Sequence, residues 1–369
     1  MRELIAAGWD VHLVTDPSDG FERLRDIAGL TLHALPMKRP PAPLHDLRSL
    51  MRWRRLLKSL RPDVVVAGTP KAGLLGMLAA RMQGVQTRVY HLRGLRYEGL
   101  SGLSRFISLR MEHLTASRAT VLLCDAPSMR AAVIASGLAG AERTIVLGAG
   151  SACGVELDRF HLPTNDERQE ARELFDISPA AFVIGFVGRI TEDKGIAELL
   201  RAAAAVHAAH PQVVLLLVGP IEEPHGLDAE ELLLLGEAWV RTLGYLQEPS
   251  AAYRAMDIYC LPSHREGFPI SPLEAMASGL PIVSTDATGC IDAVRPGITG
   301  LVVPVRDTAK LTEALLSIVE NPELGKEMGI QGRAWVSADF DSRQVTRNFI
   351  AYMTSLISEQ GTTPTGSAA

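Results

Sequence analysis

Long apolar runs are missing from this chain of 369 residues. No stretch reaches the roughly 18 apolar residues that a membrane-spanning helix needs, so the sequence predicts no transmembrane segment. The start, MRELIAAGWD, lacks the basic and then apolar segments of a secretory signal peptide. Cysteine is scarce, and its four copies are dispersed without C-x-x-C spacing. We therefore expect reduced thiols, a cytoplasmic location and no structural zinc.

Several catalytic and cofactor motifs are also absent. The sequence contains no Walker motif, no G-x-G-x-x-G fingerprint and no H-E-x-x-H pair. The stretch LGAGSACG, residues 147–154, has the wrong spacing for a dinucleotide fingerprint and leads to a proline instead of a helix. An NAD-dependent oxidoreductase is therefore disfavoured. No Ser-His-Asp or Cys-His set can be assembled, and no Asp-x-Asp metal motif follows a strand.

The charge is unevenly distributed along the chain. Residues 1–160 carry 22 Lys and Arg against 14 Asp and Glu, whereas residues 161–369 carry 15 against 28. This asymmetry indicates that the first half faces an anionic partner. Many of its cations lie in residues 44–61, where leucines and Trp53 recur at helical spacing. Such a basic amphipathic helix can lie on an anionic membrane, although a solvated helix with its apolar stripe in the core explains it too. We expect no nucleic-acid partner.

Short strand-like runs alternate with helix-like runs throughout the chain. The alternation predicts an α/β protein with parallel sheets, and it restarts after a polar linker near 155–167. We expect two domains, residues 1–160 and 161–340, a last helix at 341–358 that crosses back towards the first domain, and a disordered tail at 359–369.

The first domain begins with RELIAAGWDVHLVTD, which is typical of the end of a helix followed by its strand. A doubly wound domain usually begins with a strand and a glycine-containing turn before that helix. We therefore expect the first strand of this domain to be missing, and the chain to be truncated at its start.

A candidate phosphate site follows the strand-like run FVIGFVG. Gly188 leads into a polar loop that carries Arg189 and Lys194 and then opens a helix. Amides at a helix start and two cations can hold phosphate together, although a surface loop with incidental charge fits the same residues.

Two carboxylates mark the segment HREGFPISPLEAMASG, residues 264–279. Glu266 lies in a loop next to a glycine, where the backbone can approach a ligand closely. Glu274 follows Ser271 by three residues, and Pro272 lies between them. This spacing predicts a capping box with Ser271 as the N-cap, which gives Glu274 a structural role as an alternative to a functional one.

Two strand ends in the first half carry candidate ligand-binding residues. His91 and Arg93 follow the run TRVY, and Thr69 and Lys71 follow DVVVAG. Ligands bind at the carboxyl ends of parallel strands, so all four residues are candidates for contact with an anionic ligand. A structural histidine and an exposed lysine at a helix start are the alternatives.

The second half resembles glycosyltransferase family 4 (group 1), retaining enzymes of the GT-B fold. The resemblance lies in GRITEDKG, in the segment from LGYLQEPS to GLVVP, and in the E-x7-E pair Glu266 and Glu274. The phrases TPKAGLLG, LRGLRYEG and LGAGSACGVELDRF in the first half are similar, more loosely, to enzymes of capsular or surface polysaccharide synthesis. The resemblance implies two Rossmann-like domains that face a central cleft.

The family resemblance also implies roles for individual residues. Glu266 would face the donor sugar, Glu274 would bind the ribose, and Arg189 and Lys194 would neutralise the leaving diphosphate without a metal. The other implied donor and acceptor contacts are Gly188, Gly267, Phe268, Pro269, Ile270, Ser271, Tyr245, Leu246, His91, Arg93, Thr69 and Lys71.

These roles imply transfer of a sugar from a nucleotide-diphosphate donor, with UDP as the expected nucleotide, to a lipid-linked or oligosaccharide acceptor. The resemblance further implies retention of configuration and no cofactor. Peripheral contact with the inner face of the cell membrane would go with such an acceptor. A sugar-nucleotide epimerase and an inactive, truncated nucleotide-binding protein are the alternatives.

Overall fold

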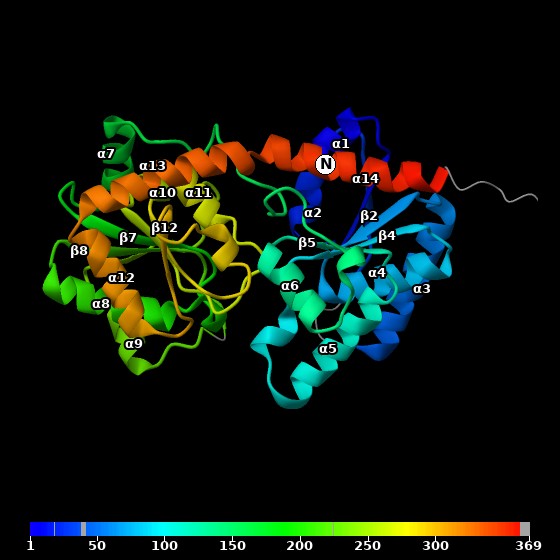
Figure 1. Ribbon diagram of the computed structural model, residues 1–369, viewed down its shortest axis with the longest axis horizontal. Coiled ribbons are helices and arrows are strands. Elements are labelled where there is room, and N and C mark those ends of the chain that lie inside the picture. The colour runs from blue at the N-terminus through cyan, green and yellow to red at the C-terminus, as the bar shows by residue number, and fades with distance from the viewer. Residues whose placement is uncertain (18, 38–41, 224, 362–369) are drawn as a thin grey trace, which may run out of the picture.

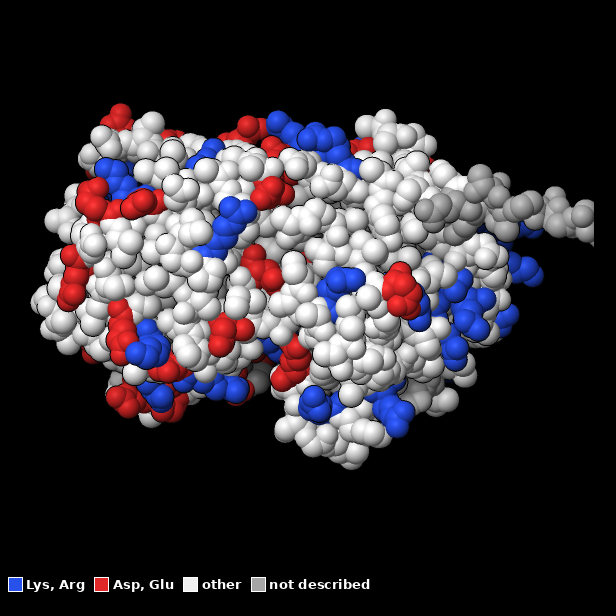
Figure 2. All heavy atoms as spheres, in the orientation of Figure 1, with Lys and Arg blue, Asp and Glu red and all other residues white. Residues whose placement is uncertain are grey.

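The computed structural model describes residues 1–17, 19–37, 42–223 and 225–361. Figure 1 shows two α/β lobes side by side along the longest axis. We call them the N-terminal lobe, whose strands lie within residues 11–145, and the C-terminal lobe, whose strands lie within residues 182–303. In Figure 2, the visible face of the C-terminal lobe carries many Asp and Glu side chains, whereas Lys and Arg predominate on the N-terminal lobe.

The N-terminal lobe contains a parallel four-stranded sheet in the order β3-β4-β5-β6. Its strands are β3 (Val64–Ala67), β4 (Thr87–Leu92), β5 (Val121–Cys124) and β6 (Thr144–Ile145). Buried residues such as Val89, Tyr90 and Leu122 come from both faces of the strands, so this sheet is covered on both sides.

A separate two-stranded parallel sheet is formed by β1 (Val11–Thr15) and β2 (Leu30–Ala34). The first residues, Arg2–Ala6, form helix α1, as expected for a helix that precedes β1. Within the described residues, no ladder of hydrogen bonds joins β1 or β2 to the four-stranded sheet. The N-terminal lobe therefore lacks a continuous central sheet.

The C-terminal lobe is built on a parallel six-stranded sheet in the order β12-β11-β10-β7-β8-β9. Its strands are β7 (Phe182–Val187), β8 (Val213–Val218), β9 (Val240–Thr242), β10 (Ile258–Leu261), β11 (Ile282–Thr285) and β12 (Gly300–Val303). From β7 the chain adds strands outward in one direction, and from β10 it adds them in the other. The switch point between β7 and β10 is where doubly wound sheets bind ligands, outside the carboxyl ends of the strands.

Helices connect the strands, as the alternation of strand-like and helix-like runs predicts. The helices of the N-terminal lobe are α2 (Asp19–Leu24), α3 (Pro43–Leu60), α4 (Pro70–Met82), α5 (Gly102–Ala116) and α6 (Pro127–Ala135). The helices that follow are α7 (Asn165–Leu174), α8 (Ile196–Ala209), α9 (Ala229–Leu235), α10 (Ser250–Ala255), α11 (Ser271–Ala277), α12 (Thr308–Val319), α13 (Pro322–Asp339) and α14 (Ser342–Gly361). None of the helices that the structure describes is long and apolar enough to cross a bilayer.

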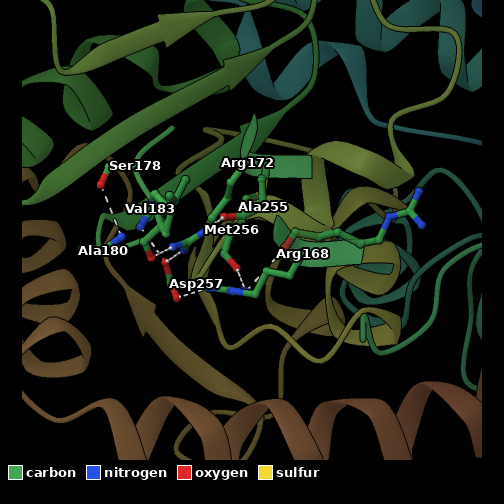
Figure 3. A network of polar contacts seen from close by, with 10 residues as sticks. Arg168, Arg172, Ser178, Ala180, Val183, Ala255, Met256 and Asp257 are labelled. Atoms are coloured by element: carbon green, nitrogen blue, oxygen red, sulfur yellow. Dashed lines mark hydrogen bonds and ion pairs between the residues drawn. The ribbon is translucent and has the colours of Figure 1, made fainter. Parts of the chain in front are cut away.

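Asp257, which lies just before β10, joins helix α7 and strand β7 at the start of the C-terminal lobe. Its carboxylate accepts hydrogen bonds from Arg172 of α7 at 2.7 Å and from the Val183 amide of β7 at 2.7 Å, and it also pairs with Arg168 (Figure 3). Arg172 further donates to the carbonyl oxygens of Ala255 and Pro179. Because the Arg172 side chain is almost fully buried, this network stabilises α7 against the sheet.

The last helix returns to the N-terminal lobe. Figure 1 shows α14 running from the C-terminal lobe across the top of the N-terminal lobe. Its Met353 is buried in an apolar cluster with Val89 and Leu123 of β4 and β5. The helix continues to Gly361, into the first residues of the predicted tail. The rest of that tail, residues 362–369, lies outside the described residues.

Candidate functional site

The switch point of the C-terminal sheet brings Lys194 and Glu266 together. Lys194 belongs to the loop after β7, and Glu266 belongs to the loop after β10. The Lys194 ammonium forms an ion pair with the Glu266 carboxylate, and only 16% and 14% of the two side chains are exposed. An ion pair with so little exposure is screened weakly by solvent, so each charge strongly orients the other.

A glycine permits this close approach of the two loops. Gly195 has φ 69° and caps the start of α8. A Cβ atom at this position would clash with the backbone carbonyl oxygen of Pro262. Only glycine fits, because both the positive φ and the lack of space exclude a side chain.

Glu266 is held by neighbours from three directions. Ser263 donates a hydrogen bond to Glu266 Oε1 at 2.9 Å, on the same oxygen that Lys194 contacts. The Glu266 amide donates to the carbonyl oxygen of Thr288 at 3.0 Å. Both side-chain contacts are therefore on Oε1, and no hydrogen bond to Oε2 is found among the described residues.

Glu274 lies on α11, and its carboxylate accepts a hydrogen bond from the Tyr253 hydroxyl at 2.7 Å. Burial raises the pKa of Glu274, and the hydrogen bond from Tyr253 offsets this only in part. The predicted capping box is wrong. Helix α11 has Ile270 at its N-cap position, and among the described residues no side chain caps the start of this helix. Ser271 instead accepts a hydrogen bond from the Tyr259 hydroxyl at 2.7 Å.

Arg189 lies further out than Lys194. Its guanidinium group pairs with Glu222 at 2.9 Å, and 56% of its side chain is exposed. The loop from Arg189 to Lys194 is stabilised by Asp193, which accepts hydrogen bonds from Thr191 at 2.6 Å and from Arg265 at 3.0 Å. The structure therefore places Lys194, but not Arg189, in contact with Glu266.

On the N-terminal lobe, His91 pairs with an aspartate that the sequence analysis did not single out. His91 lies near the end of β4, and Asp125 follows β5, the next strand in the sheet. His91 Nε2 lies 2.5 Å from Asp125 Oδ1, and Arg93 Nε lies 3.7 Å from the other oxygen, Oδ2. Asp125 is buried and His91 is half-buried, so the carboxylate fixes the orientation of the imidazole ring.

The two lobes meet at these loops. A Cβ atom on Gly267 would clash with the carbonyl oxygen of Arg93, so the two backbones are in contact. A Cβ atom on Gly150, at the end of the N-terminal lobe, would lie 3.0 Å from the Phe268 ring. The sequence-predicted residues of both halves, His91 and Arg93 on one side and residues 266–268 on the other, therefore face one another.

A second bridge between the lobes involves Ser128 at the start of α6. Its amide donates to Asp292 Oδ2 at 3.1 Å, its hydroxyl also donates to Asp292, and the same hydroxyl accepts a bond from the Gly289 amide at 2.8 Å. Sequence reasoning missed this bridge, and a pair so far apart along the chain leaves no local signal.

The remaining predicted residues follow strands β3, β7, β9 and β10. Thr69 is exposed beside Gly68, which itself packs against His91, and Lys71 pairs with Asp46 at 2.8 Å. Tyr245 is exposed after β9, and Leu246 packs against the core. Pro269 is buried and Gly188 and Ile270 are half-buried. Across the part of the chain that the structure describes, no three His, Cys, Asp or Glu side chains form a cluster that could hold a metal ion.

Comparisons with known proteins identify the family. The family model described as glycosyl transferases group 1 matches residues 167–335, and the model described as glycosyl transferase 4-like domain matches residues 1–150. The capsular polysaccharide biosynthesis glycosyltransferase CapM of Staphylococcus aureus is 34% identical over 335 residues, which cover 90% of this chain and 87% of CapM. This chain is a group 1 glycosyltransferase. The switch-point site with Lys194, Glu266 and Glu274 is therefore the candidate active site of a glycosyltransferase.

One further relative and one solved structure are also similar to this glycosyltransferase. The UDP-Gal:alpha-D-GlcNAc-diphosphoundecaprenol alpha-1,3-galactosyltransferase of Escherichia coli is 24% identical over 327 residues, which cover 86% of this chain and 81% of that protein. The crystal structure of Anabaena Alr3699/HepE in complex with UDP and glucose superposes with a TM-score of 0.81 and 20% identity, covering 95% of this chain and 94% of that one. The GT-B fold expected from the sequence is confirmed.

Proposed function

We propose that this glycosyltransferase transfers a hexosyl or N-acetylhexosaminyl group from a UDP-sugar to a lipid-linked saccharide, with retention of configuration, in the synthesis of a capsular or other surface polysaccharide. The observation that carries the proposal is the half-buried Lys194–Glu266 pair at the switch point, with Glu274 on the adjoining helix and the His91–Arg93 loop opposite. The names of CapM and of the E. coli galactosyltransferase support the polysaccharide role and the lipid-linked acceptor. The HepE complex supports UDP as the nucleotide.

The chemistry follows from where charge develops. As the bond between the sugar and the diphosphate breaks, negative charge grows on the leaving phosphate oxygen. A fixed ammonium such as that of Lys194 stabilises this charge more in the transition state than in the ground state. Because the same ammonium pairs with Glu266, the donor diphosphate would compete with that carboxylate for it. Arg189 would add a second cation from the rim of the site.

Retention would follow from attack on the face that the diphosphate leaves. The acceptor oxygen forms its bond to the anomeric carbon there, and its proton passes to the departing phosphate oxygen. No protein nucleophile is needed, so Glu266 would stabilise the sugar instead of attacking it. Glu274 would accept hydrogen bonds from the ribose hydroxyls. Asp125 would keep His91 oriented towards the donor sugar or the acceptor.

The acceptor would reach this site from a membrane. Residues 44–61, most of which form α3, carry a row of arginines, and we propose that they make peripheral contact with the anionic inner face of the cell membrane. A diphosphate-linked lipid acceptor is itself anionic, so the same charges would attract it.

The proposed activity is tested by incubating the purified protein with a panel of UDP- and GDP-sugars and an undecaprenyl-diphosphate saccharide, followed by mass spectrometry. The expected result is free UDP together with an acceptor that is heavier by one sugar, and NMR of the product is expected to show the anomeric configuration of the donor. An epimerised sugar would instead identify a sugar-nucleotide epimerase. Nucleotide binding without any product, with every donor and acceptor, would identify a protein that only binds nucleotides.

A further inference from the structure

The start of α5 exposes apolar side chains that the N-terminal lobe does not bury. Leu103 is 73% exposed, Phe106 is 54% exposed and Ile107 is 52% exposed. Every residue from 101 to 107 is exposed, so this part of the helix protrudes from the lobe. The later part of α5 is anchored, because Glu112 and Thr115 are buried and the helix packs beside α4. A protruding apolar helix start is costly in water unless a partner covers it.

This protrusion lies beside the junction of the two lobes. Glu98, shortly before α5, lies 3.2 Å from Thr288 of the C-terminal lobe, and Gly99 packs directly against the Arg265 side chain. Figure 1 places α5 at the lower end of the N-terminal lobe, and Figure 2 shows a hollow in the surface between the lobes next to it. The segment that leads into α5 is therefore in contact with the loop that carries Glu266.

Helix α3 presents similar side chains at the same edge of the lobe. Its start lies beside the start of α4, because Asp46 pairs with Lys71. Leu44 and Leu47, in its first two turns, are 79% and 57% exposed. Helices that return between parallel strands all begin at the carboxyl edge of the sheet, so the starts of α3 and α5 lie on the edge that also carries His91.

The exposed charges on these two helices are all positive. Asp46 is paired with Lys71, and Glu112 is buried and accepts a hydrogen bond from Tyr90 at 2.7 Å. Among the described residues, none of the exposed cations on α3 and α5 forms an ion pair with a carboxylate. These exposed cations are Arg48, Arg52, Arg55, Lys58, Arg105 and Arg110.

The charge favours a lipid surface over a second copy of this chain. Two copies that joined through this face would bring two sets of unpaired cations together, which repel each other. An anionic bilayer offers apolar chains beneath a layer of phosphates, which matches apolar side chains ringed by arginine. The guanidinium group of Arg110 lies 5.1 Å from the centroid of the Phe106 ring. The guanidinium group can therefore contact lipid phosphates while the Phe106 ring is buried among the acyl chains.

We propose that the start of α5 inserts Leu103, Phe106 and Ile107 into the interface of an anionic membrane, while the cations of α3 and α5 bind the lipid phosphates. Whereas the basic segment 44–61 alone would hold the protein near the membrane, the insertion of α5 fixes its orientation. The junction of the two lobes then faces the lipid headgroups. That last step rests on the proposed lipid-linked acceptor, but the lipid contact itself does not.

The test places a single tryptophan reporter at the proposed point of insertion. Phe106→Trp and the matched control Leu233→Trp are prepared in a protein whose four tryptophans are replaced by phenylalanine. Leu233 is a suitable control because it is another exposed apolar residue, 73% exposed against 54% for Phe106, and it lies on α9 of the C-terminal lobe. Vesicles contain phosphatidylcholine with about 30 mol % phosphatidylglycerol, with bromine on the acyl chains. Bromine quenches only a tryptophan that reaches the acyl region.

We expect the fluorescence of the Phe106→Trp reporter to be quenched and shifted to the blue, and that of the Leu233→Trp reporter to be unchanged. In the otherwise native protein, Phe106→Glu should weaken flotation with these vesicles by about tenfold or more, and Leu233→Glu by less than about twofold. If the tryptophan-replaced background does not fold, the flotation pair decides the outcome alone.

Equal quenching of the two reporters, or flotation that Phe106→Glu leaves unchanged, would overturn the proposal. A dimer in sedimentation experiments that Phe106→Glu dissociates would show that a second copy, and not lipid, covers this face. Binding of UDP-glucose should be unaffected by Phe106→Glu. Loss of lipid binding and loss of donor binding are thus separate results, and the first does not depend on the proposed reaction.

Discussion

The carboxylate of Asp292 in the C-terminal lobe accepts hydrogen bonds from both the amide and the hydroxyl of Ser128 in the N-terminal lobe. Burial raises the pKa of Asp292, and the bonds from Ser128 offset this only in part. The hydrogen bonds between Ser128 and Asp292 thus join the lobes through a partly desolvated carboxylate, which water would solvate better if the lobes moved apart. This bridge is one of several polar contacts between the lobes, and the hydrogen bond between Thr288 and Glu98 is another.

Replacement of Ser128 by alanine should favour separation of the lobes. We expect turnover to fall by about tenfold, or about 1.4 kcal/mol, because the acceptor side and the donor side of the site come from different lobes. Binding of UDP-glucose should change by less than about twofold, since the proposed donor contacts lie mainly in one lobe.

Steady-state kinetics measure the turnover of Ser128→Ala, calorimetry measures its affinity for UDP-glucose, and X-ray scattering measures its radius of gyration. Ser317→Ala, which removes a hydroxyl bonded within α12, is the control. Unchanged turnover and size in Ser128→Ala would exclude this role.

Binding of the donor should depend on the ionisation of Glu274. Burial raises the pKa of Glu274 above its ordinary value of 4.5, and the ionised carboxylate is the better acceptor for ribose hydroxyls. The affinity for UDP-glucose should therefore be highest above this raised pKa and should fall as the pH drops through it. Calorimetric titrations from about pH 8 down to about pH 5 measure the effect.

Two variants check that assignment. Tyr253→Phe removes the hydrogen bond that partly offsets burial, so it should move the loss of affinity to higher pH. Glu274→Gln should bind about tenfold more weakly at about pH 8 and should lose this pH dependence. The same pH profile in wild type and in Glu274→Gln would contradict a ribose-binding role for Glu274.

Removal of the Asp257 carboxylate should destabilise the C-terminal lobe. Asp257→Ala would leave the buried guanidinium group of Arg172 without its charged partner, at a cost of about 3 kcal/mol in the free energy of unfolding. Urea denaturation measures this value. Glu248→Ala, which breaks the more exposed ion pair with Arg159, should cost less than about 1 kcal/mol. Equal stabilities of the two variants would show that the network in Figure 3 contributes little.

Catalysis should not need a divalent metal. In the proposed mechanism Lys194 and Arg189 supply the positive charge that a metal supplies in other transferases. Turnover in excess EDTA should therefore equal turnover in the untreated protein, as measured by the release of UDP. Activity that returns only when manganese or magnesium is added would show that the two side chains do not replace the metal.

The sequence predicts the parts of this protein that depend on local patterns. Alternating strand-like and helix-like runs predicted the parallel sheets of both lobes. The strand ends directed attention to His91 and Lys194, and the neighbouring glycine directed attention to Glu266. The family resemblance, which two family models and CapM confirm, supplied roles that spacing could not. Even so, Arg189 and Lys194 looked equivalent in the sequence, whereas the fold pairs only Lys194 with Glu266.

The rest depends on contacts between distant parts of the chain. Tyr253, Asp125 and the Ser128–Asp292 bridge had no local signal, because each meets its partner only after the sheets form. The capping box failed for the same reason. Ser271 is the first residue inside α11, one position after the N-cap residue Ile270. Its hydroxyl accepts a hydrogen bond from Tyr259, and the carboxylate of Glu274 accepts one from Tyr253.

The most direct test of the central claim is the initial rate of UDP release, with acceptor present, from folded protein that lacks Lys194. Lys194→Ala should lower turnover by about 100-fold or more, or about 2.7 kcal/mol, because it removes the charge that stabilises the leaving diphosphate. Lys310→Ala, which removes an exposed lysine that pairs with Glu313, should leave the rate unchanged. A folded double variant, Arg189→Ala with Lys194→Ala, that released UDP at the wild-type rate would contradict the assignment of the diphosphate site.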